Sequence, residues 1–217
     1  MTSPEVRPER RQFQQRFVDF ARQHEWFGRY FNAITWSRSK KVVSYFAAFL
    51  PEQGRLLDIG TGTGHVAALL QTPSRSVVGC DIMNLLMLPL PYVLADGGRL
   101  PFRNASFDVL LLITVLHHVP KSLHSRFLSE AARVLKSGGR LIVMEDTFHG
   151  AIEREATKFF DSVMNGEFAG HPHANRALVE WAELMTQAGF QVHQRVEHVA
   201  WYGVFRMRHG IVVGERK

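Results

Sequence analysis

The chain has 217 residues, of which 46% are hydrophobic and 21% charged, and this composition excludes a disordered, collagen-like or disulfide-rich chain. Cys80 is its single cysteine, which excludes an intramolecular disulfide and fits a reducing compartment. The sequence contains no run of about 18 apolar residues that would predict a membrane span, and its polar start, residues 1–11, does not resemble a secretory signal. We therefore expect one cytoplasmic domain with a core of ordinary size.

The formal net charge of +6, with histidine counted as neutral, is concentrated at the two ends of the chain. Residues 1–41 hold nine Lys or Arg against four Asp or Glu, and residues 190–217 hold five against two. Residues 42–189 hold twelve against fourteen, so the middle is nearly neutral. Two interpretations are open: solvated helix and strand faces, or attraction to an anionic partner such as RNA, a membrane surface or an acidic metabolite.

Aromatic residues are concentrated in residues 1–50, which hold 11 of the chain's 24. Apolar residues at helical spacing predict a helix over 9–24, a second aromatic cluster over 26–36 and a third helix over 42–50, which Pro51 ends. We expect this segment to form a helical cap that covers the remaining domain or a bound ligand.

Short apolar runs alternate with helical patterns after Pro51, which is typical of a parallel α/β sheet with helices on both faces. Two of the runs, 109–113 and 141–144, are continuously apolar, as strands buried on both faces should be. The pattern predicts strands at Arg55–Ile59, Ser76–Asp81, Tyr92–Ala95, Asp108–Thr114 and Arg140–Glu145, with helices at Gly64–Gln71 and Ser122–Leu135.

The last third of the chain begins with a different pattern. We expect residues 51–217 to form one domain in which residues 147–175 are an insertion on the substrate side. The predicted elements here are an amphipathic helix over 152–164, a Gly- and Pro-containing loop over 165–175, a helix over 176–188, and two closing strands over 190–199 and 204–214 that form an antiparallel hairpin.

The strongest motif runs from Leu56 to Gly64, reads LLDIGTGTG, and lies where a strand passes into a helix. Glycines there allow a tight turn and let a ligand approach the backbone. The spacing G-x-G-x-G differs from the G-x-G-x-x-G of dinucleotide sites, and no Lys-Ser/Thr pair follows it as in a phosphate-binding loop. Asp58 directly precedes the loop, where a carboxylate repels phosphate and attracts an ammonium group. The loop therefore favours a nucleoside with an amino-acid tail.

Two further carboxylates follow the next two predicted strands. Asp81 stands 17 residues after Gly64, where a carboxylate can accept both hydroxyls of a ribose. Asp96 ends the third predicted strand. Because the carboxyl ends of parallel strands meet at one edge of the sheet, we expect Asp58, Asp81 and Asp96 to lie along one crevice. Each alone could cap a helix or a turn, but the set beside a glycine loop indicates a ligand site.

On these residues the sequence resembles the class I S-adenosylmethionine-dependent methyltransferases, in the ubiquinone/menaquinone-type (methyltransferase type 11-like) subgroup. That subgroup also includes natural-product and tRNA-modifying enzymes. The resemblance extends over about residues 55–145 and depends on the order of its segments as much as on the glycine loop. The matching segments are Leu57–Gly64, Gly79–Ile82, Ala95–Phe102, Phe107–Val109, Leu116–Val119 and Arg133–Leu141.

The resemblance implies a Rossmann-like fold, with a mostly parallel seven-stranded sheet and a C-terminal antiparallel hairpin, and it implies S-adenosylmethionine as the cofactor. Asp58 would orient the cofactor's ammonium group, Asp81 would bind the ribose hydroxyls, and Asp96 would accept a hydrogen bond from the adenine amino group. The other implied cofactor residues are Gly60, Gly62 and Gly64 beside the amino-acid tail, Thr61 in the same loop, Ile82 and Gly97 beside the adenine, and Thr114 near the sulfonium.

One departure from the family's pattern lies between the second and third carboxylates. Only fourteen residues separate Asp81 from Asp96, and Pro89 and Pro91 disfavour the long helix that the family usually has there. The apolar residues 82–94 either pack in the core or form an exposed surface for a second subunit or a lipid.

Catalytic residues are harder to predict, because methyl transfer mainly requires that a nucleophile is aimed at the methyl group. Weak candidates for a general base are His118, which follows the fourth predicted strand, and His149 and His173 in the predicted insertion. Residues 145–146, both acidic, either cap the following helix or contact the substrate. The histidines lack neighbouring cysteines or suitably spaced carboxylates, so we expect no metal site.

We expect methyl transfer to a small-molecule acceptor, a metabolite or natural product, beneath the aromatic cap. Alternatives are an RNA-directed methyltransferase that uses the basic ends, a membrane-surface enzyme that acts on a quinone or lipid, and a non-catalytic protein that keeps the fold. Residues 114–117 lack the signature of amino-methylating DNA enzymes, and Cys80, beside the predicted ribose site, does not supply the nucleophile of carbon-5 pyrimidine methylation. The sequence leaves the oligomeric state open.

Overall fold

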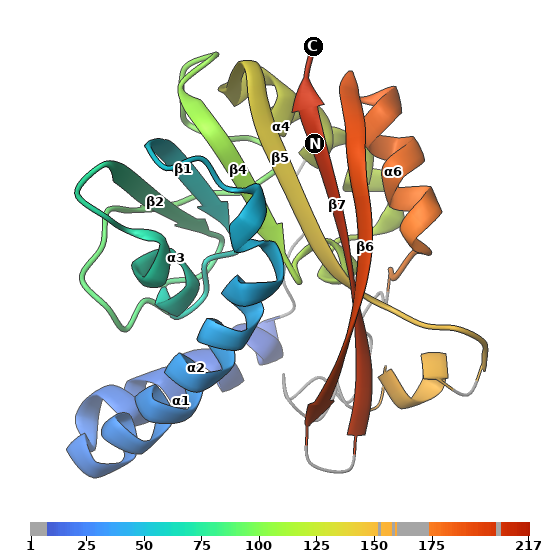
Figure 1. The fold of residues 1–217 in the computed structure, drawn as a ribbon. Coiled ribbons are helices and arrows are strands. Elements are labelled where there is room, and N and C mark those ends of the chain that lie inside the picture. Colours follow the sequence, from blue (N-terminus) through green and yellow to red (C-terminus); the bar gives the residue numbers. More distant parts are fainter. Residues whose placement is uncertain (1–7, 152, 158, 160–173, 203–204) are drawn as a thin grey trace.

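The structure, a computed structural model, describes residues 8–151, 153–157, 159, 174–202 and 205–217. Helices surround a single seven-stranded sheet (Figure 1). The helices are α1 (Pro8–Gln23), α2 (Glu25–Phe46), α3 (His65–Leu70), α4 (His124–Val134) and α6 (Leu178–Gln187), with short 3-10 helices at Ala47–Phe49, Leu116–His118 and Lys121–Leu123. The strands are β1 (Gly54–Ile59), β2 (Arg75–Asp81), β3 (Tyr92–Leu94), β4 (Phe107–Ile113), β5 (Leu135–Thr147), β6 (Phe190–Tyr202) and β7 (Phe205–Arg216).

The sheet has the strand order β3-β2-β1-β4-β5-β7-β6. Strands β1 to β5 pair in parallel, whereas β7 pairs antiparallel with both β5 and β6. The predicted fold class is therefore confirmed, including the C-terminal hairpin. The order reverses between β1 and β4, and open α/β sheets bind ligands in the crevice at the carboxyl ends of the strands at such a reversal.

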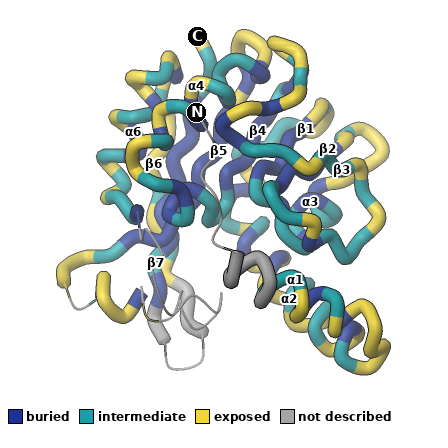
Figure 2. Tube along the Cα trace, turned by 180° about the vertical axis from the view of Figure 1, so that it is seen from behind, coloured by how far each residue is buried: buried dark blue, intermediate teal, exposed yellow. Residues whose placement is uncertain are grey.

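Each face of the sheet has its own hydrophobic core, because successive side chains of a strand point to opposite faces. Leu110 and Leu112 of β4 belong to the cluster that includes α4 and α6, whereas Val109 and Leu111 belong to the cluster that includes α2 and α3. All four are at most 1% exposed. Figure 2 shows the buried residues concentrated along the central strands, as the continuously apolar runs predict.

The N-terminal segment differs from its prediction in one respect. Residues 26–36 and 42–50 do not form separate helices: α2 runs unbroken from Glu25 to Phe46 and is followed by a single 3-10 turn. No proline interrupts this stretch, so nothing forces the helix to end before Pro51. The C-terminal half of α2 packs against α3 and the sheet, and its N-terminal half extends away beside α1 (Figure 1).

The other predicted elements are confirmed with shifted ends. The last two strands are longer than predicted, because the antiparallel hairpin gives both strands pairing partners over nearly their whole length. Strand β5 begins at Leu135 rather than Arg140, where Leu135 pairs with Phe107 of β4. Residues 82–91 form no helix, as the prolines predict. Of the predicted helix over 152–164, residues 153–157 and 159 are described and are helical, as predicted. The rest of that helix and most of the predicted loop over 165–175 lie outside the described residues. Among the helices that the structure describes, none is both long and apolar enough to cross a membrane.

Candidate functional site

The glycine loop follows β1 and is held by hydrogen bonds to the end of β2. The backbone amide of Gly60 donates to the carbonyl oxygen of Cys80 over 2.7 Å, and the amide of Gly64 donates to the carbonyl of Thr61 over 2.9 Å. The hydroxyl of Thr61 donates to Oδ2 of Asp58 over 2.7 Å. The loop is therefore a closed turn whose first carboxylate is bonded within the turn itself.

Gly60 and Gly62 need glycine for different reasons, although both have a positive φ, 73° and 51°. A Cβ on Gly60 would lie 2.3 Å from Cγ2 of Val115, so packing against the loop after β4 excludes a side chain. A Cβ on Gly62 would meet no atom within 4 Å. Gly62 therefore faces open space, where a ligand can approach the backbone.

Asp58 is a buried carboxyl group, only 2% exposed. Burial raises its pKa from 3.8 to about 7, and the negative charge of Asp81 adds to the rise, against the lowering effect of the Thr61 hydrogen bond. A cationic group beside Asp58 would stabilise the ionised carboxylate. The site is therefore suited to an ammonium group and unsuited to phosphate.

Asp81 joins the glycine loop to the loop after β2. Its Oδ2 accepts a hydrogen bond from the amide of Gly62 over 2.9 Å, and its Oδ1 accepts one from the amide of Met83 over 3.0 Å. A carboxylate oxygen can accept more than one hydrogen bond, so a ribose hydroxyl can bind beside these amides. Asp81 therefore sets the shape of both loops in addition to its predicted ligand role.

The third carboxylate follows β3. Oδ1 of Asp96 accepts a hydrogen bond from the amide of Gly98 over 2.8 Å, and its Oδ2 lies 4.0 Å from the guanidinium of Arg126. Gly97 is buried, and a Cβ there would lie 2.6 Å from the ring of Phe127. Ile82 is half-buried at the end of β2. The structure thus brings the predicted residues of β1, β2 and β3 to one edge of the sheet.

Cys80 has no role as a nucleophile in this arrangement. Burial, followed by the charges of Asp81, Asp58 and Asp96, raises the pKa of its thiol to about 12. Because the thiolate is the reactive form, the thiol is inert at neutral pH.

The loop after β4 completes this edge of the sheet. Thr114 has a positive φ of 55°, rare for a residue other than glycine, and its amide donates to the carbonyl of Met144 over 2.7 Å. The buried carboxylate of Glu145 accepts hydrogen bonds from the amides of Val115 and Leu116, over 2.9 and 2.6 Å, and its other oxygen lies 2.5 Å from Nδ1 of His117. Glu145 thus fixes the unusual backbone at Thr114.

A cavity of about 170 Å³ lies between α2 and the ends of four adjacent strands. Of the predicted cofactor residues, it contacts five; Gly64, Asp81, Ile82, Asp96 and Gly97 are outside its lining. The lining residues are Thr35, Arg38, Ser39 and Val42 of α2, Asp58 and Gly60–Thr63, His65 and Val66, Ile113 and Thr114, Met144, and His209.

His65 is a site residue that the sequence analysis missed. Its Nδ1 lies 2.9 Å from the hydroxyl of Thr63, and its Nε2 lies 3.1 Å from Oδ1 of Asn32 on α2. Its ring contacts Trp36 edge to face at 5.2 Å, and burial lowers its pKa. The signal for His65 in the sequence was its position directly after Gly64. The structure shows that His65 anchors α2 over the glycine loop through Asn32.

His209 is the second residue that the sequence analysis missed. It lies on β7 directly opposite Asp146 of β5, and its Nδ1 is 2.7 Å from Oδ1 of Asp146. Both are buried, at 3% and 5% exposure. Burial by itself would raise the pKa of Asp146, but the hydrogen bond from His209 and the nearby charges of His209, His117 and Arg38 lower it below its ordinary value. The sequence predicts that residues 145–146 either cap the following helix or contact the substrate. In the structure, Glu145 instead bonds to the loop after β4 and Asp146 bonds to His209.

The weak candidates for a base lie outside the cavity's lining or outside the described residues. His149 is exposed and its Nε2 lies 2.9 Å from Oε2 of Glu197. His118 is half-buried and its ring centroid is 3.9 Å from that of His117. His173 lies outside the described residues. No group of three or more metal-binding side chains occurs in the part of the chain that the structure describes.

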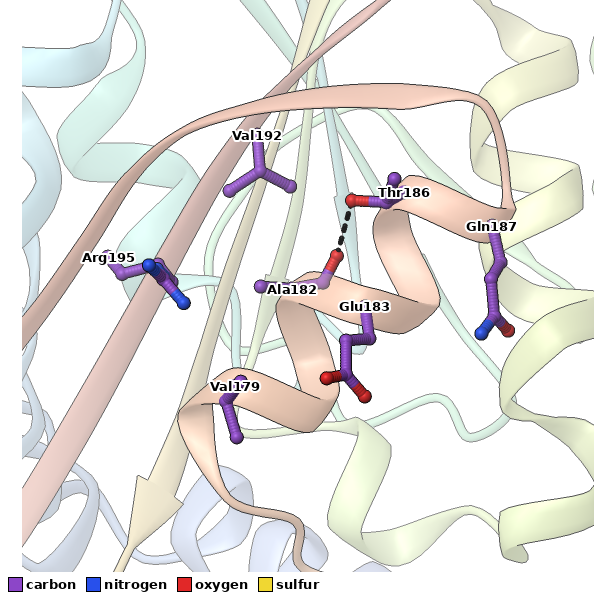
Figure 3. A pocket seen from close by; sticks show the side chains of 7 residues that line it. All are labelled: Val179, Ala182, Glu183, Thr186, Gln187, Val192 and Arg195. Carbon is purple, nitrogen blue, oxygen red and sulfur yellow. Dashed lines mark hydrogen bonds between the residues drawn. The ribbon is translucent and has the colours of Figure 1, made fainter.

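A larger depression, about 470 Å³, lies between α6 and β6 (Figure 3). It is lined by Val179, Glu183 and Thr186 of α6 and by Val192 and Arg195 of β6. Because β6 is the edge strand farthest from β3, this depression is separated from the glycine loop by most of the sheet. We therefore place the functional site at the smaller cavity, where the carboxylates meet.

Comparison with known proteins identifies the family of the chain. A family model described as a methyltransferase domain matches residues 57–143. A demethylmenaquinone methyltransferase of Thermotoga maritima is 30% identical over 178 residues, which is 70% of this chain and 76% of the relative. The chain is a class I S-adenosylmethionine-dependent methyltransferase.

Two further comparisons extend over different lengths of the methyltransferase. A ubiquinone/menaquinone biosynthesis C-methyltransferase of Syntrophotalea carbinolica is 38% identical over 103 residues, 42% of this chain and 44% of the relative. The crystal structure of a methyltransferase from Methanosarcina mazei has a TM-score of 0.62 at 21% identity and covers 79% of this chain and 96% of that one. The second likeness shows the fold alone.

The residues of the methyltransferase fit its cofactor, S-adenosylmethionine. The open space in front of Gly62 admits a ligand to the loop backbone, and the buried Asp58 and the cationic Arg38 line the same cavity. A zwitterionic amino-acid tail would thus meet one negative and one positive side chain.

Proposed function

We propose that the methyltransferase transfers the methyl group of S-adenosylmethionine to a small aromatic acceptor of the quinol type. The observation that carries the proposal is the single cavity that extends from the glycine loop, across the ends of β4 and β5, to β7. Residues of α2 cover one side of it, so an acceptor can approach the proposed cofactor position from the side of β5 and β7. The names of the two sequence relatives, which refer to menaquinone and ubiquinone, support the acceptor class.

In this proposal the cofactor supplies an electrophilic methyl group and the chain supplies its position. Asp58 binds the ammonium group, with Gly60, Thr61, Gly62 and Gly64 around the amino-acid tail. Arg38 of α2 pairs with the tail's carboxylate. The remaining roles follow the strand ends: Asp81 binds the ribose hydroxyls, Ile82, Asp96 and Gly97 contact the adenine, and Thr114 lies near the sulfonium.

The proposed domain boundary lies between residues 50 and 51, where the cap ends and the catalytic domain begins. Residues 1–50 act as a cap whose C-terminal half covers the cavity through Thr35, Arg38, Ser39 and Val42, and residues 51–217 form the catalytic domain with the insertion 147–175. We also propose a cytoplasmic location, supported by one buried free cysteine.

The test is transfer of labelled methyl groups from S-adenosylmethionine to reduced 1,4-naphthoquinone, followed by the same assay on a host extract separated into organic-soluble, small aqueous, RNA and protein fractions. We expect label in the quinol and in the organic-soluble fraction. Label that ribonuclease releases would overturn the proposal in favour of the basic ends as an RNA-binding surface. Label in the lipid part of the organic fraction alone would favour a membrane-surface substrate.

The matched control is Asp81→Ala, assayed beside the natural chain. The variant removes a charged acceptor for two hydroxyls and releases the amides of Gly62 and Met83. We expect cofactor affinity to fall at least about tenfold, or roughly 1.4 kcal/mol, in titration calorimetry with S-adenosylhomocysteine. Unchanged affinity would contradict the proposed cofactor site.

A further inference from the structure

The pair of His209 and Asp146 lies at the far end of the cavity from the glycine loop. The two residues are 63 positions apart in the sequence and become neighbours only because β5 and β7 pair antiparallel, with Asp146 directly opposite His209. Directly paired residues of adjacent strands point to the same face. That face also carries Met144, Ile211 and the contact with α2.

The strand order fixes where this pair lies relative to the cofactor. The cavity is lined in turn by Asp58 on β1, Thr114 after β4, Met144 on β5 and His209 on β7, which are four neighbouring strands of the sheet. Adjacent strands are about 4.8 Å apart, so β7 lies roughly 10 Å beyond β4 and 14 Å beyond β1. An acceptor that fills the space between them would touch the proposed sulfonium position on one side and His209 on the other.

We propose, on the basis of the proposed function, that His209 is the base that accepts the proton of the methyl acceptor and that Asp146 is the positioning residue that holds its imidazole. The acceptor is then a neutral molecule with an acidic hydroxyl group, as in a phenol or a quinol.

The hydrogen bond to Asp146 selects the state that a base needs. A carboxylate that accepts from Nδ1–H fixes the tautomer in which Nε2 carries the lone pair, and it stabilises the imidazolium that forms when Nε2 takes a proton. The lowered pKa of Asp146 keeps this partner ionised at neutral pH. The pair therefore has the orientation and the charge required for general-base catalysis.

Other charged and titratable groups surround this pair on every packed element. Arg38 and Asp58 line the same cavity, and Arg38 and His117 act electrostatically on Asp146. The ring of Tyr45 on α2 is 6.0 Å from His209, and His198 of β6 is its cross-strand partner.

The proton and charge balance of the step is complete without another reactant. As the acceptor forms its new bond to the methyl carbon, the bond from that carbon to sulfur breaks, and the sulfonium becomes the neutral thioether of S-adenosylhomocysteine. The acceptor's hydroxyl proton moves to Nε2 of His209, so the positive charge passes from sulfur to the imidazolium beside Asp146. Exchange with water after product release restores the neutral ring.

The first test compares three variants with the natural chain, using methyl-labelled S-adenosylmethionine and reduced 1,4-naphthoquinone. His209→Gln keeps a polar side chain without a base, and we expect kcat to fall at least about 100-fold while the affinity for S-adenosylhomocysteine changes less than threefold. Asp146→Asn should lower kcat about tenfold and move the pH of half-maximal rate downward, because the imidazolium loses its charged partner. The matched control is His193→Gln, at an exposed histidine of β6, which should leave kcat and the pH profile unchanged.

These kinetic results also separate the proposed base from a structural role. A His209→Gln variant that keeps more than a third of the natural kcat would overturn the proposal. So would a loss of kcat that is matched by an equal loss of cofactor affinity or by thermal unfolding below the assay temperature. If His209→Gln does not fold, the shift of the pH profile in Asp146→Asn decides, and an unshifted profile overturns the proposal.

A second readout does not depend on turnover. Nitrogen-15 NMR of the histidine rings, with S-adenosylhomocysteine bound, should show His209 with its proton on Nδ1 in the neutral form, and this preference should be lost in Asp146→Asn. A proton fixed on Nε2 in the natural chain would overturn the proposal. If the natural chain binds S-adenosylhomocysteine but methylates no quinol, the proposed acceptor has failed, and this spectrum still decides on His209 and Asp146.

Discussion

The two ends of the site are built in different ways. At the cofactor end, each of the three carboxylates bonds within its own turn: Asp58 with Thr61, Asp81 with Met83, and Asp96 with the amide two residues later. One further hydrogen bond, from Gly62 to Asp81, joins two loops across 19 residues. At the acceptor end, Asp146 meets His209 across 63 residues, and Glu145 meets the loop after β4 across about 30. The first end is made mainly by turns, and the second by contacts between distant segments.

This difference predicts which property a substitution at each end should change. A turn that contains its own hydrogen bonds can lose one of them and keep its neighbours, so we expect changes at the cofactor end to affect ligand binding more than folding. Hydrogen bonds between distant segments stabilise the packing of those segments. We expect changes at the acceptor end to affect stability and catalysis together.

The largest effect on stability is expected for Glu145→Ala. The variant leaves the buried amides of Val115 and Leu116 and Nδ1 of His117 without their acceptor, and unsatisfied buried donors should lower the free energy of unfolding by about 3–5 kcal/mol in total. Urea titration followed by circular dichroism measures this loss. Glu145→Gln keeps one acceptor oxygen and should lower the free energy of unfolding by about half as much.

A loss of less than about 1 kcal/mol in Glu145→Ala would mean that water replaces the carboxylate. The contrast between the two ends of the site would then be wrong, because the long-range contacts would not stabilise the fold.

The next largest effects are expected for substitutions of Gly60 and Gly62, which should separate folding stability from ligand binding within the glycine loop. Gly60→Ala combines the cost of a left-handed residue with a clash against Val115, and should lower the free energy of unfolding by about 2–4 kcal/mol. Gly62→Ala carries only the backbone cost of about 1 kcal/mol, but its methyl group points into the space that the cofactor needs.

Thermal unfolding and calorimetry with S-adenosylhomocysteine should therefore rank these two variants in opposite orders. Gly60→Ala should lose more stability, and Gly62→Ala should lose more affinity relative to its loss of stability. Equal ratios in the two variants would remove the assignment of Gly62 to the ligand side of the loop.

Features that depend on local contacts could be predicted from the sequence, and features that depend on distant contacts could not. The glycine loop and the carboxylates at the ends of β1 and β2 and after β3 are short segments whose residue types carry the chemistry. The structure places them at one edge of the sheet, as the strand pattern predicts. His209 carries no local signal, because its partner is chosen by the register of β5 and β7, which depends on the whole sheet. The same limit explains α2: periodicity indicated helix in both pieces, but only packing shows that they form one helix.

A smaller effect is expected from pH, through Asp58. Its pKa in the folded chain, about 7, lies above the ordinary value of 3.8, so between these pH values the folded chain holds a proton that the unfolded chain has released. Stability should therefore fall as pH rises through this window, while the affinity for a cationic ammonium group should rise. Between about pH 5.5 and 7, where the ligand's amino group is mostly protonated, affinity for S-adenosylhomocysteine should increase about tenfold.

The variant Asp58→Asn removes this dependence in both measurements. Above pH 7 it should raise the melting temperature by several degrees, and its affinity for S-adenosylhomocysteine should be low and independent of pH. Glu183→Gln, a change at an exposed carboxylate on α6, is the matched control and should keep the natural pH profile. A natural chain whose affinity does not change over this pH range would contradict the pairing of Asp58 with the ammonium group.

The smallest effect is expected at Trp26, and it tests how far the cap reaches. Trp26 lies on the part of α2 that extends from the sheet and is 69% exposed, whereas Trp36, on the same helix, contacts the ring of His65 beside the cavity. Trp26→Ala should change the free energy of unfolding by less than about 0.5 kcal/mol and leave the KM for reduced 1,4-naphthoquinone unchanged. Trp36→Ala should lose at least about 1 kcal/mol and raise that KM, because α2 shifts over the glycine loop. If Trp26→Ala raises the KM as much as Trp36→Ala does, the exposed half of α2 folds over the acceptor during turnover, and the aromatic segment predicted to cover the ligand extends to Trp26.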